Sequence, residues 1–172
     1  MREKIEEERM LSKKLLKEIN EQINKELYSA YLYLAMAAHF ENASLPGFAH
    51  WMRKQAEEET EHAMKFFDYV VDRGGKVQLE AIEKPPTEFE NPTAVAEQVL
   101  EHERFVTSRI NLLYSIAVED KDFASQSFLN WFVDEQVEEE KNVSAIVDSL
   151  KMTGEKGNSL FMLDQHLAKS ED

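Results

Sequence analysis

Glu57-Glu58-Glu59-Thr60-Glu61-His62 is the stretch of this sequence that decides the fold. No Gly or Pro occurs between Gly47 and Gly74, so we expect the stretch to lie in the middle of a helix. Positions three and four apart share one helix face, and here that face reads Met52, Gln55, Glu59, His62, Phe66, Tyr69. A buried carboxylate without a partner costs several kcal/mol. The Glu-x-x-His spacing therefore suggests a metal ion, although the motif alone is weak.

The composition of the chain narrows the possible functions. The 172 residues carry a net charge of −14, which favours cations as partners and opposes a nucleic-acid surface. With 0 Cys, any metal ligands are oxygen or nitrogen atoms. The start of the chain, residues 1–6, is charged and unlike a signal peptide. The longest uncharged run, residues 27–40, is too short to cross a membrane, so we expect a cytoplasmic protein without a membrane partner.

Working outward from that stretch, a first helix is expected from Ser12, an N-cap residue, to Phe40. The face of this helix that is expected to be buried, called its seam here as for the other helices, reads Leu16, Ile19, Ile23, Glu26, Ala30, Tyr33, Ala37. Glu26 is either a ligand or an acid reaching solvent, and Tyr33 taken alone is best interpreted as a core aromatic. The short break at residues 41–45 and the first-turn Pro46 predict an antiparallel hairpin with the second helix.

The second helix is expected to end at Gly74-Gly75, and no helical period follows until Asn91. These 18 residues, extended at roughly 3.3 Å each, reach roughly 59 Å. A helix of twenty-eight residues is only roughly 42 Å long. The segment can therefore cross the whole bundle and leave the second and third helices parallel. Alternation at Val77, Leu79 and Ala81 predicts an extended strip lying on the bundle.

The third and fourth helices show the same interrupted seams. Asn91-Pro92 predicts a helix start, and Glu103 stands in the middle of the stripe Ala96, Val99, Glu103, Val106, Ile110, Leu113, Ala117. The neighbouring His102 points roughly 100° away and is interpreted as a surface residue. After the turn at residues 119–122, the last seam reads Leu129, Phe132, Gln136, Glu139, Val143, Ile146, Leu150.

A final amphipathic stretch follows Gly154 and Gly157, with Leu160, Phe161, Leu163 and Leu167 as its apolar residues. It is too short to be stable alone. We expect it either at a subunit contact or docked on its own bundle. The chain is thus expected to be an all-α protein, with a four-helix bundle over residues 1–153 and a short fifth helix and tail over 154–172 of the same domain.

Four seams carry their polar residues near mid-length, and chance is a poor explanation for that coincidence. Four carboxylates in a metal-free bundle would repel one another, whereas two divalent cations would balance them. Ligation by oxygen with one imidazole suits iron or manganese rather than structural zinc. The residues involved are Glu26, Glu59, His62, Glu103, Gln136 and Glu139. A metal-free helical scaffold is the alternative.

The local sequences resemble the non-haem bacterial and archaeal ferritins of the ferritin-like di-iron superfamily. The matching stretches are NKELYS at 24–29, EEETEH at 57–62, HE at 102–103 and NWFVDEQ at 130–136. Di-iron bundles of this kind carry a Glu on two helices and Glu-x-x-His on the others. Here Gln136-x-x-Glu139 replaces the second Glu-x-x-His, as in the non-haem ferritins. The resemblance covers nearly the whole chain.

The resemblance implies a role for each matching position. One iron would be held by Glu26, Glu59 and His62, and the other by Glu59, Glu103, Gln136 and Glu139. Tyr33 matches the tyrosine beside the centre. A third, inward-facing iron site would use Glu58, Glu135 and Glu138, whose alternative interpretation is a solvated acidic face. Thr60 stands where bacterioferritins carry a haem-ligating Met, so we expect no haem.

The resemblance also implies a function, namely a cage of 24 subunits that oxidises Fe(II) with O₂ or peroxide and stores ferric mineral. A rubrerythrin-like peroxidase and a DNA-protecting mini-ferritin are the alternatives. The absence of Cys opposes the first, and the fifth helix and the lack of a basic tail oppose the second. Animal ferritins place acids at threefold pores near the start of the fourth helix, where this chain has only Asp122 close by. The route by which iron enters is therefore not implied.

Overall fold

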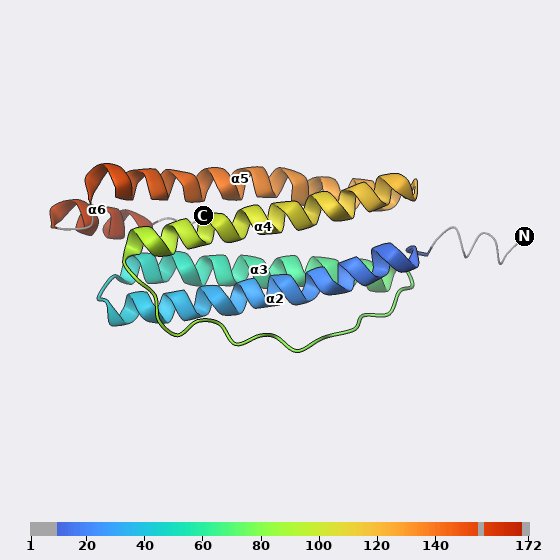
Figure 1. The fold of residues 1–172 in the computed structure, drawn as a ribbon, viewed down its shortest axis with the longest axis horizontal. Coiled ribbons are helices and arrows are strands. Elements are labelled where there is room, and N and C mark those ends of the chain that lie inside the picture. The colour runs from blue at the N-terminus through green and yellow to red at the C-terminus, as the bar shows by residue number, and fades with distance from the viewer. Residues whose placement is uncertain (1–9, 155–156, 170–172) are drawn as a thin grey trace, which may run out of the picture.

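The structure is a computed structural model that describes residues 10–154 and 157–169. Within that part of the chain the elements are all helical, and Figure 1 shows four long helices with a short fifth against one end. Their bounds are α2 (Lys13–Asn42), α3 (Pro46–Asp72), α4 (Pro92–Glu119), α5 (Phe123–Thr153) and α6 (Asn158–Leu167). The predicted all-α four-helix bundle is confirmed. None of the described helices is long and apolar enough to cross a membrane.

Helices α2 and α4 begin where the predicted N-cap residues place them. Ser12 Oγ accepts the backbone N–H of Leu15 at 3.1 Å, and Asn91 Oδ1 accepts that of Ala94 at 2.8 Å. Helix α2 continues to Asn42, two residues beyond the expected end at Phe40. The charged residues 1–6, on which the cytoplasmic expectation partly rests, lie outside the described residues.

The segment between α3 and α4 runs along the length of the bundle beside α2, so that α3 and α4 point the same way (Figure 1). Two asparagines of α2 hold it through backbone atoms. Asn20 Nδ2 donates to Lys76 O at 3.1 Å and its Oδ1 accepts Gln78 N at 2.7 Å, and Asn24 Nδ2 donates to Ala81 O at 3.2 Å. The expected extended strip does lie along the bundle (Figure 1), but its alternation does not bury apolar residues beyond Val77, because Leu79 is 64% exposed and Ala81 is also exposed.

The interior is divided into two apolar clusters. One lies toward the α2–α3 turn and includes Met36, Phe40 and Val147, and the other lies toward the α4–α5 turn and includes Ile19, Phe66 and Leu129. The polar seam residues lie between these clusters, near the middle of all four helices. Water is therefore excluded from both ends of the polar layer.

Helix α6 docks on its own bundle, which is one of the two arrangements expected for the last segment. The N-cap residue of α3, Leu45, offers no side-chain hydrogen bond. Instead the buried Asp164 of α6 accepts the backbone N–H groups of Gly47 and Phe48 at 2.8 and 3.1 Å. A Cβ at Gly47 would meet the Asp164 carbonyl oxygen at 1.7 Å, so this contact requires glycine.

We predict that Asp164→Ala lowers the free energy of unfolding by about 1–2 kcal/mol, because it leaves two buried N–H groups at the start of α3 without an acceptor. The measurement is thermal unfolding followed by circular dichroism. Asp148→Ala, at an exposed position of α5, is the control. Equal stability of the two variants would contradict the capping role.

Candidate metal centre

The fold brings the six predicted ligand residues into the layer between the two apolar clusters. Helix α2 contributes one, α3 two, α4 one and α5 two. All six are buried, with exposures between 0% and 8%: Glu26, Glu59, His62, Glu103, Gln136 and Glu139. Each side chain comes from the mid-length of its helix and points inward because the heptad seam that carries it faces the bundle axis.

One half of the layer is formed by Glu26, Glu59 and His62. Each offers a ligand atom, and these atoms lie within 4.8 Å of one another. His62 Nδ1 lies 3.9 Å from Glu59 Oε2. The Oε2 atoms of both glutamates are buried without a hydrogen-bond partner. Two buried carboxylate oxygens aimed at an imidazole nitrogen are a donor set that suits a divalent cation.

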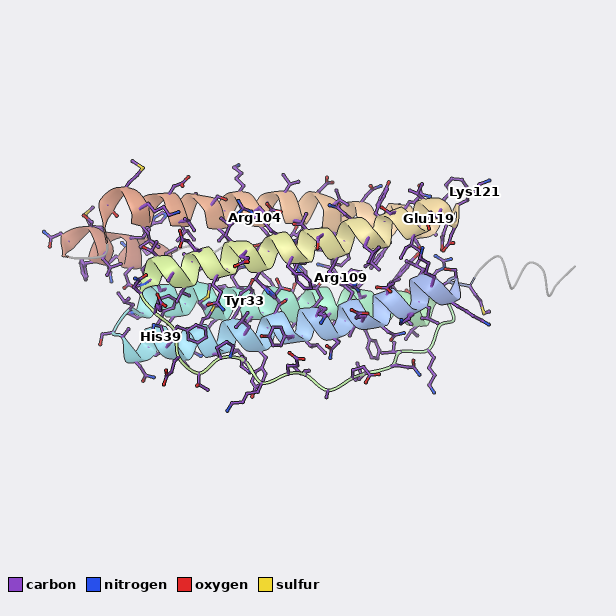
Figure 2. The ribbon with its side chains drawn as sticks, in the orientation of Figure 1. Tyr33, His39, Arg104, Arg109, Glu119 and Lys121 are labelled. Atoms are coloured by element: carbon purple, nitrogen blue, oxygen red, sulfur yellow. The ribbon has the colours of Figure 1, made fainter. Side chains whose placement is uncertain are left out.

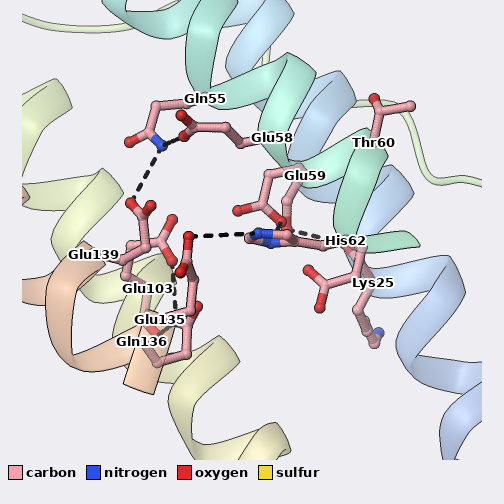
Figure 3. Close-up of polar contacts among 12 residues, drawn as sticks. Lys25, Gln55, Glu58, Glu59, Thr60, His62, Glu103, Glu135, Gln136 and Glu139 are labelled. Atoms are coloured by element: carbon pink, nitrogen blue, oxygen red, sulfur yellow. Dashed lines mark hydrogen bonds and ion pairs between the residues drawn. The ribbon is translucent and has the colours of Figure 1, made fainter. Parts of the chain in front are cut away.

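The other half is formed by Glu103, Gln136 and Glu139, together with Tyr33 (Figure 3 shows the first three). The Tyr33 hydroxyl donates to Glu103 Oε1. Gln136 Nε2 donates to Glu103 Oε2 at 3.2 Å. Both oxygens of Glu103 thus have donors, and burial raises the pKa of the Tyr33 hydroxyl so that it keeps its proton.

The four carboxylates do not ionise like surface groups. Burial raises the pKa of Glu103 to about 7 and that of Glu139 to about 8, where neighbouring carboxylates add to the shift. Burial also raises the pKa of Glu26, and that of Glu59 well above its ordinary value. The metal-free layer therefore holds protons at neutral pH that a cation would displace.

His62 is held as a neutral ligand. Burial lowers the pKa of its imidazole to about 4, so a ring nitrogen has a free lone pair at neutral pH. The ring packs against Trp131 and Phe132, with centroids 5.4 and 5.7 Å apart. This aromatic wall fixes the ring and excludes water on that side.

The acids of the expected third site lie beside this layer. Glu58 and Glu135 are partly buried and Glu138 is exposed. They line a cavity of about 550 Å³ that also reaches Glu139 and, on α6, His166. Gln55 Nε2 joins the two groups of acids, since it donates to Glu58 Oε2 at 2.7 Å and to Glu139 Oε2 at 3.2 Å (Figure 3).

The sequence-based interpretation of His102 as a surface residue is only partly right, because the residue is half-buried. Its Nε2 lies 2.7 Å from Ser29 Oγ, and its ring meets that of Tyr33 at 5.8 Å. Burial lowers the pKa of His102 to about 4. The residue closes the outer side of the layer, because α2 covers the direction in which it points.

Two buried amides were also missed as parts of the site. Gln55 lies on the predicted seam with no further role expected, and no role is expected for Gln22. Gln22 Nε2 donates to Glu26 Oε1 at 2.8 Å. Both precede a candidate ligand by four positions, at Glu26 and Glu59, and that spacing was the available signal.

Asp122, the acid near the start of α5, already has partners. Its carboxylate accepts two hydrogen bonds from Arg73, at 2.8 and 3.1 Å, and caps α5 through Ser125 N at 3.0 Å. Although burial opposes it, the hydrogen bonds from Arg73 and Ser125 lower the pKa of Asp122. This acid joins α3 to α5 and is not a free cation ligand in the subunit.

Comparison with known proteins finds ferritins at the level of family, sequence and structure. The family model described as a ferritin-like domain matches residues 16–153. The chain is 45% identical over 160 residues to a bacterial non-haem ferritin of Bacteroides fragilis, covering 93% of this chain and 99% of that protein. It is 43% identical over 159 residues to one of Staphylococcus haemolyticus, covering 92% and 96%. A solved open-pore ferritin of Archaeoglobus fulgidus superposes with a TM-score of 0.92 at 49% identity, covering 94% of this chain and 98% of that one.

We predict that the metal-free protein becomes less stable as the pH rises from about 6.5 to about 8; below about pH 6.5 the lowered pKa values of His62 and His102 act in the opposite direction. The folded state keeps protons on Glu103 and Glu139 in this range, whereas the unfolded chain loses them near the ordinary pKa of 4.5. Stability falls wherever the folded state binds more protons. Co(II) should remove the decline, because metal binding displaces those protons and strengthens with pH.

The measurement is the unfolding temperature against pH, with and without Co(II). Glu139→Gln, which removes one titrating group, should flatten the decline of the metal-free protein. A metal-free unfolding temperature that is constant or rises over this range would contradict the predicted protonation of the layer.

Proposed function

The chain belongs to the ferritin family, and we propose that it is an iron-storage ferritin that oxidises Fe(II) in the buried carboxylate layer. The observation that carries the proposal is the pair of partnerless oxygens on Glu26 and Glu59 beside the neutral His62. Buried carboxylates without partners are costly, so the metal-free layer holds protons, and a cation between the two side chains would displace them. Fe(II) is the substrate at this site.

The two halves of the layer give two iron positions. The first Fe(II) is bound by Glu26, Glu59 and His62. The second is bound by Glu103, Gln136 and Glu139, with Glu59 bridging the two ions. Four carboxylates balance two divalent ions, and the protons that the buried acids release on binding leave the layer negative enough to hold them.

Oxidation moves one electron from each Fe(II) to the oxidant. With O₂, two electrons and two protons give H₂O₂, and two Fe(III) ions are left in the layer. With peroxide, two electrons and two protons give two molecules of water. Tyr33 keeps Glu103 oriented during this step, because its hydroxyl donates to one oxygen of that carboxylate.

The ferric product then leaves through the cavity on the inner side. Two trivalent ions exceed the charge of four carboxylates, so the product is held less well than the substrate. Glu58, Glu135 and Glu138 line the adjoining cavity and form the third iron site. Gln55 touches acids of both groups and marks the boundary between them.

Storage requires a cage, and we propose that 24 copies assemble into one in the cytoplasm. Large apolar side chains lie exposed on the single chain, at Leu79 (64%), Phe123 (77%), Val137 (70%), Met152 (86%) and Phe161 (63%). Exposed apolar surface of this kind is buried by association. The net charge of −14 attracts iron and disfavours nucleic acid as a partner. We further propose that no haem is bound, since Thr60 stands where bacterioferritins carry the haem-ligating Met, and its hydroxyl donates to Ala56 O at 2.8 Å.

We predict that Glu59→Ala and His62→Ala each slow Fe(II) oxidation at least tenfold while the cage stays assembled. Each variant removes a direct ligand, and Glu59 touches both ions. Stopped-flow absorbance of the ferric product measures the rate, and size-exclusion chromatography checks assembly. Glu61→Ala, an exposed acid on the same helix, is the matched control. Rapid oxidation in either ligand variant would exclude the assigned centre.

We predict that Gln136→Glu makes the centre retain Fe(III) instead of releasing it. A fifth carboxylate would hold Fe(III) more tightly, so the first two ions per subunit should be oxidised before turnover stalls. Multiple-turnover oxidation tests the stall, and iron counted after reductive removal of the mineral tests retention. If turnover is unchanged and no extra iron is retained, the neutral amide does not control release.

A further inference from the structure

Gln22 lies fully buried between a candidate iron ligand and a cation. Its Nε2 donates to Glu26 Oε1 at 2.8 Å, and its Oε1 accepts the Nε–H of Arg109 at 3.3 Å. Gln22 is 0% exposed, and the Arg109 side chain is 12% exposed. Gln22 and Glu26 belong to α2 and Arg109 to α4, so the chain of contacts crosses the bundle.

Arg109 fixes which end of the Gln22 amide faces Glu26. A guanidinium only donates hydrogen bonds, so the atom of Gln22 that faces it is the carbonyl oxygen. The amide nitrogen must then face the carboxylate of Glu26. The orientation of this amide therefore follows from the chemistry of its two neighbours.

Arg109 is itself held in place by α2. Its Nη2 lies 3.0 Å from Glu18 Oε2 and 3.4 Å from the Glu18 carbonyl oxygen, and its Nη1 lies 3.6 Å from Glu21 Oε1. Figure 2 shows Arg109 in the space between α4 and α2. A cation with this many acceptors cannot swing away from Gln22 without breaking several contacts.

As a result, the two oxygens of Glu26 have different surroundings. Oε1 is occupied by Gln22, whereas Oε2 is buried and has no partner. Oε2 is the oxygen left for the group formed with Glu59 and His62. Without Gln22 the carboxylate of Glu26 could rotate, and neither of its buried oxygens would have a hydrogen-bond donor.

We propose that Gln22 and Arg109 are positioning residues for the first iron, which set the orientation of Glu26 so that Oε2 faces the ion. This inference rests on the proposed function, because it takes Glu26 to be an iron ligand. Partners that orient a metal ligand typically contribute 10- to 100-fold in metal affinity. Arg109 acts through Gln22 and has no contact with the ion.

The test is anaerobic titration of Fe(II) into the metal-free cage by calorimetry, with Gln22→Leu, Arg109→Met and the double variant. Gln22→Leu should weaken one of two Fe(II) sites per subunit about tenfold or more and spare the other. Arg109→Met should weaken the same site by a smaller factor, because Gln22 is then free to turn. The double variant should be no weaker than Gln22→Leu alone.

If Arg109→Met lowers Fe(II) affinity further in the Gln22→Leu background, Arg109 acts on the bundle and not through Gln22. That result would overturn the proposed role of Arg109. If Gln22→Leu does not fold, Arg109→Met keeps every atom of Gln22 and still tests the proposal, which fails if its Fe(II) affinity is unchanged. The absorption spectrum of bound Co(II) gives an independent readout, since a reoriented Glu26 should change the coordination geometry.

Asn20→Ala is the matched control for loss of a buried amide on the same helix. Asn20 holds the crossover and contacts no candidate ligand, so its variant should lose stability and keep both Fe(II) affinities. Glu26→Ala separates the two hypotheses. If Glu26→Ala retains both Fe(II) sites, the proposed centre itself is wrong; if it loses one while Gln22→Leu loses none, only the positioning role is wrong.

Discussion

Four carboxylates share one buried layer, and much of the architecture of this bundle follows from that constraint. Each is at most 8% exposed, Glu139 borders the adjoining cavity, and together they repel one another. Apolar clusters above and below close the layer, while hydrogen bonds from neighbouring helices hold individual carboxylate oxygens. Protons occupy the layer when no metal is bound, and a cation that replaces them gains its affinity from the same repulsion.

Some carboxylate oxygens of the layer accept hydrogen bonds from neighbouring side chains, whereas others have no partner. Gln22 holds one oxygen of Glu26, and Tyr33 and Gln136 hold both oxygens of Glu103. Oε2 of Glu26 and Oε2 of Glu59 have no hydrogen-bond partner, and Glu59 Oε2 lies 3.9 Å from His62 Nδ1. Under the proposed function, the first half would be open to one ion, whereas the second half would have to exchange hydrogen bonds for metal contacts before it could take another.

Most of the fold could be predicted from the sequence because its signals are local to single helices. The caps at Ser12 and Asn91 and the seams around Glu59 each depend on residues of one element. His102 was expected to be more exposed than it is because helical periodicity gives a direction, not what covers it, and Ser29 of α2 covers it. The alternation did not predict that Leu79 is exposed, for a related reason. Hydrogen bonds from Asn20 and Asn24 to backbone atoms hold the crossover, and buried apolar side chains do not.

The partners of the site were the hardest part to foresee. The i, i+4 spacing links Gln22 to Glu26, but the role of that amide depends on Arg109, eighty-seven residues away. Likewise, the N-terminus of α3 has no cap of its own, and only the tertiary structure shows that Asp164 supplies it. Such contacts join elements whose relative position no single periodicity specifies.

The central claim is that this layer binds two iron ions. The most direct measurement is anomalous diffraction at the iron edge from crystals soaked anaerobically in Fe(II). We expect two anomalous peaks per subunit on either side of Glu59, the first beside His62 and the second beside Gln136. Iron found only on the acids of the inner cavity, with none in the buried layer, would contradict the account.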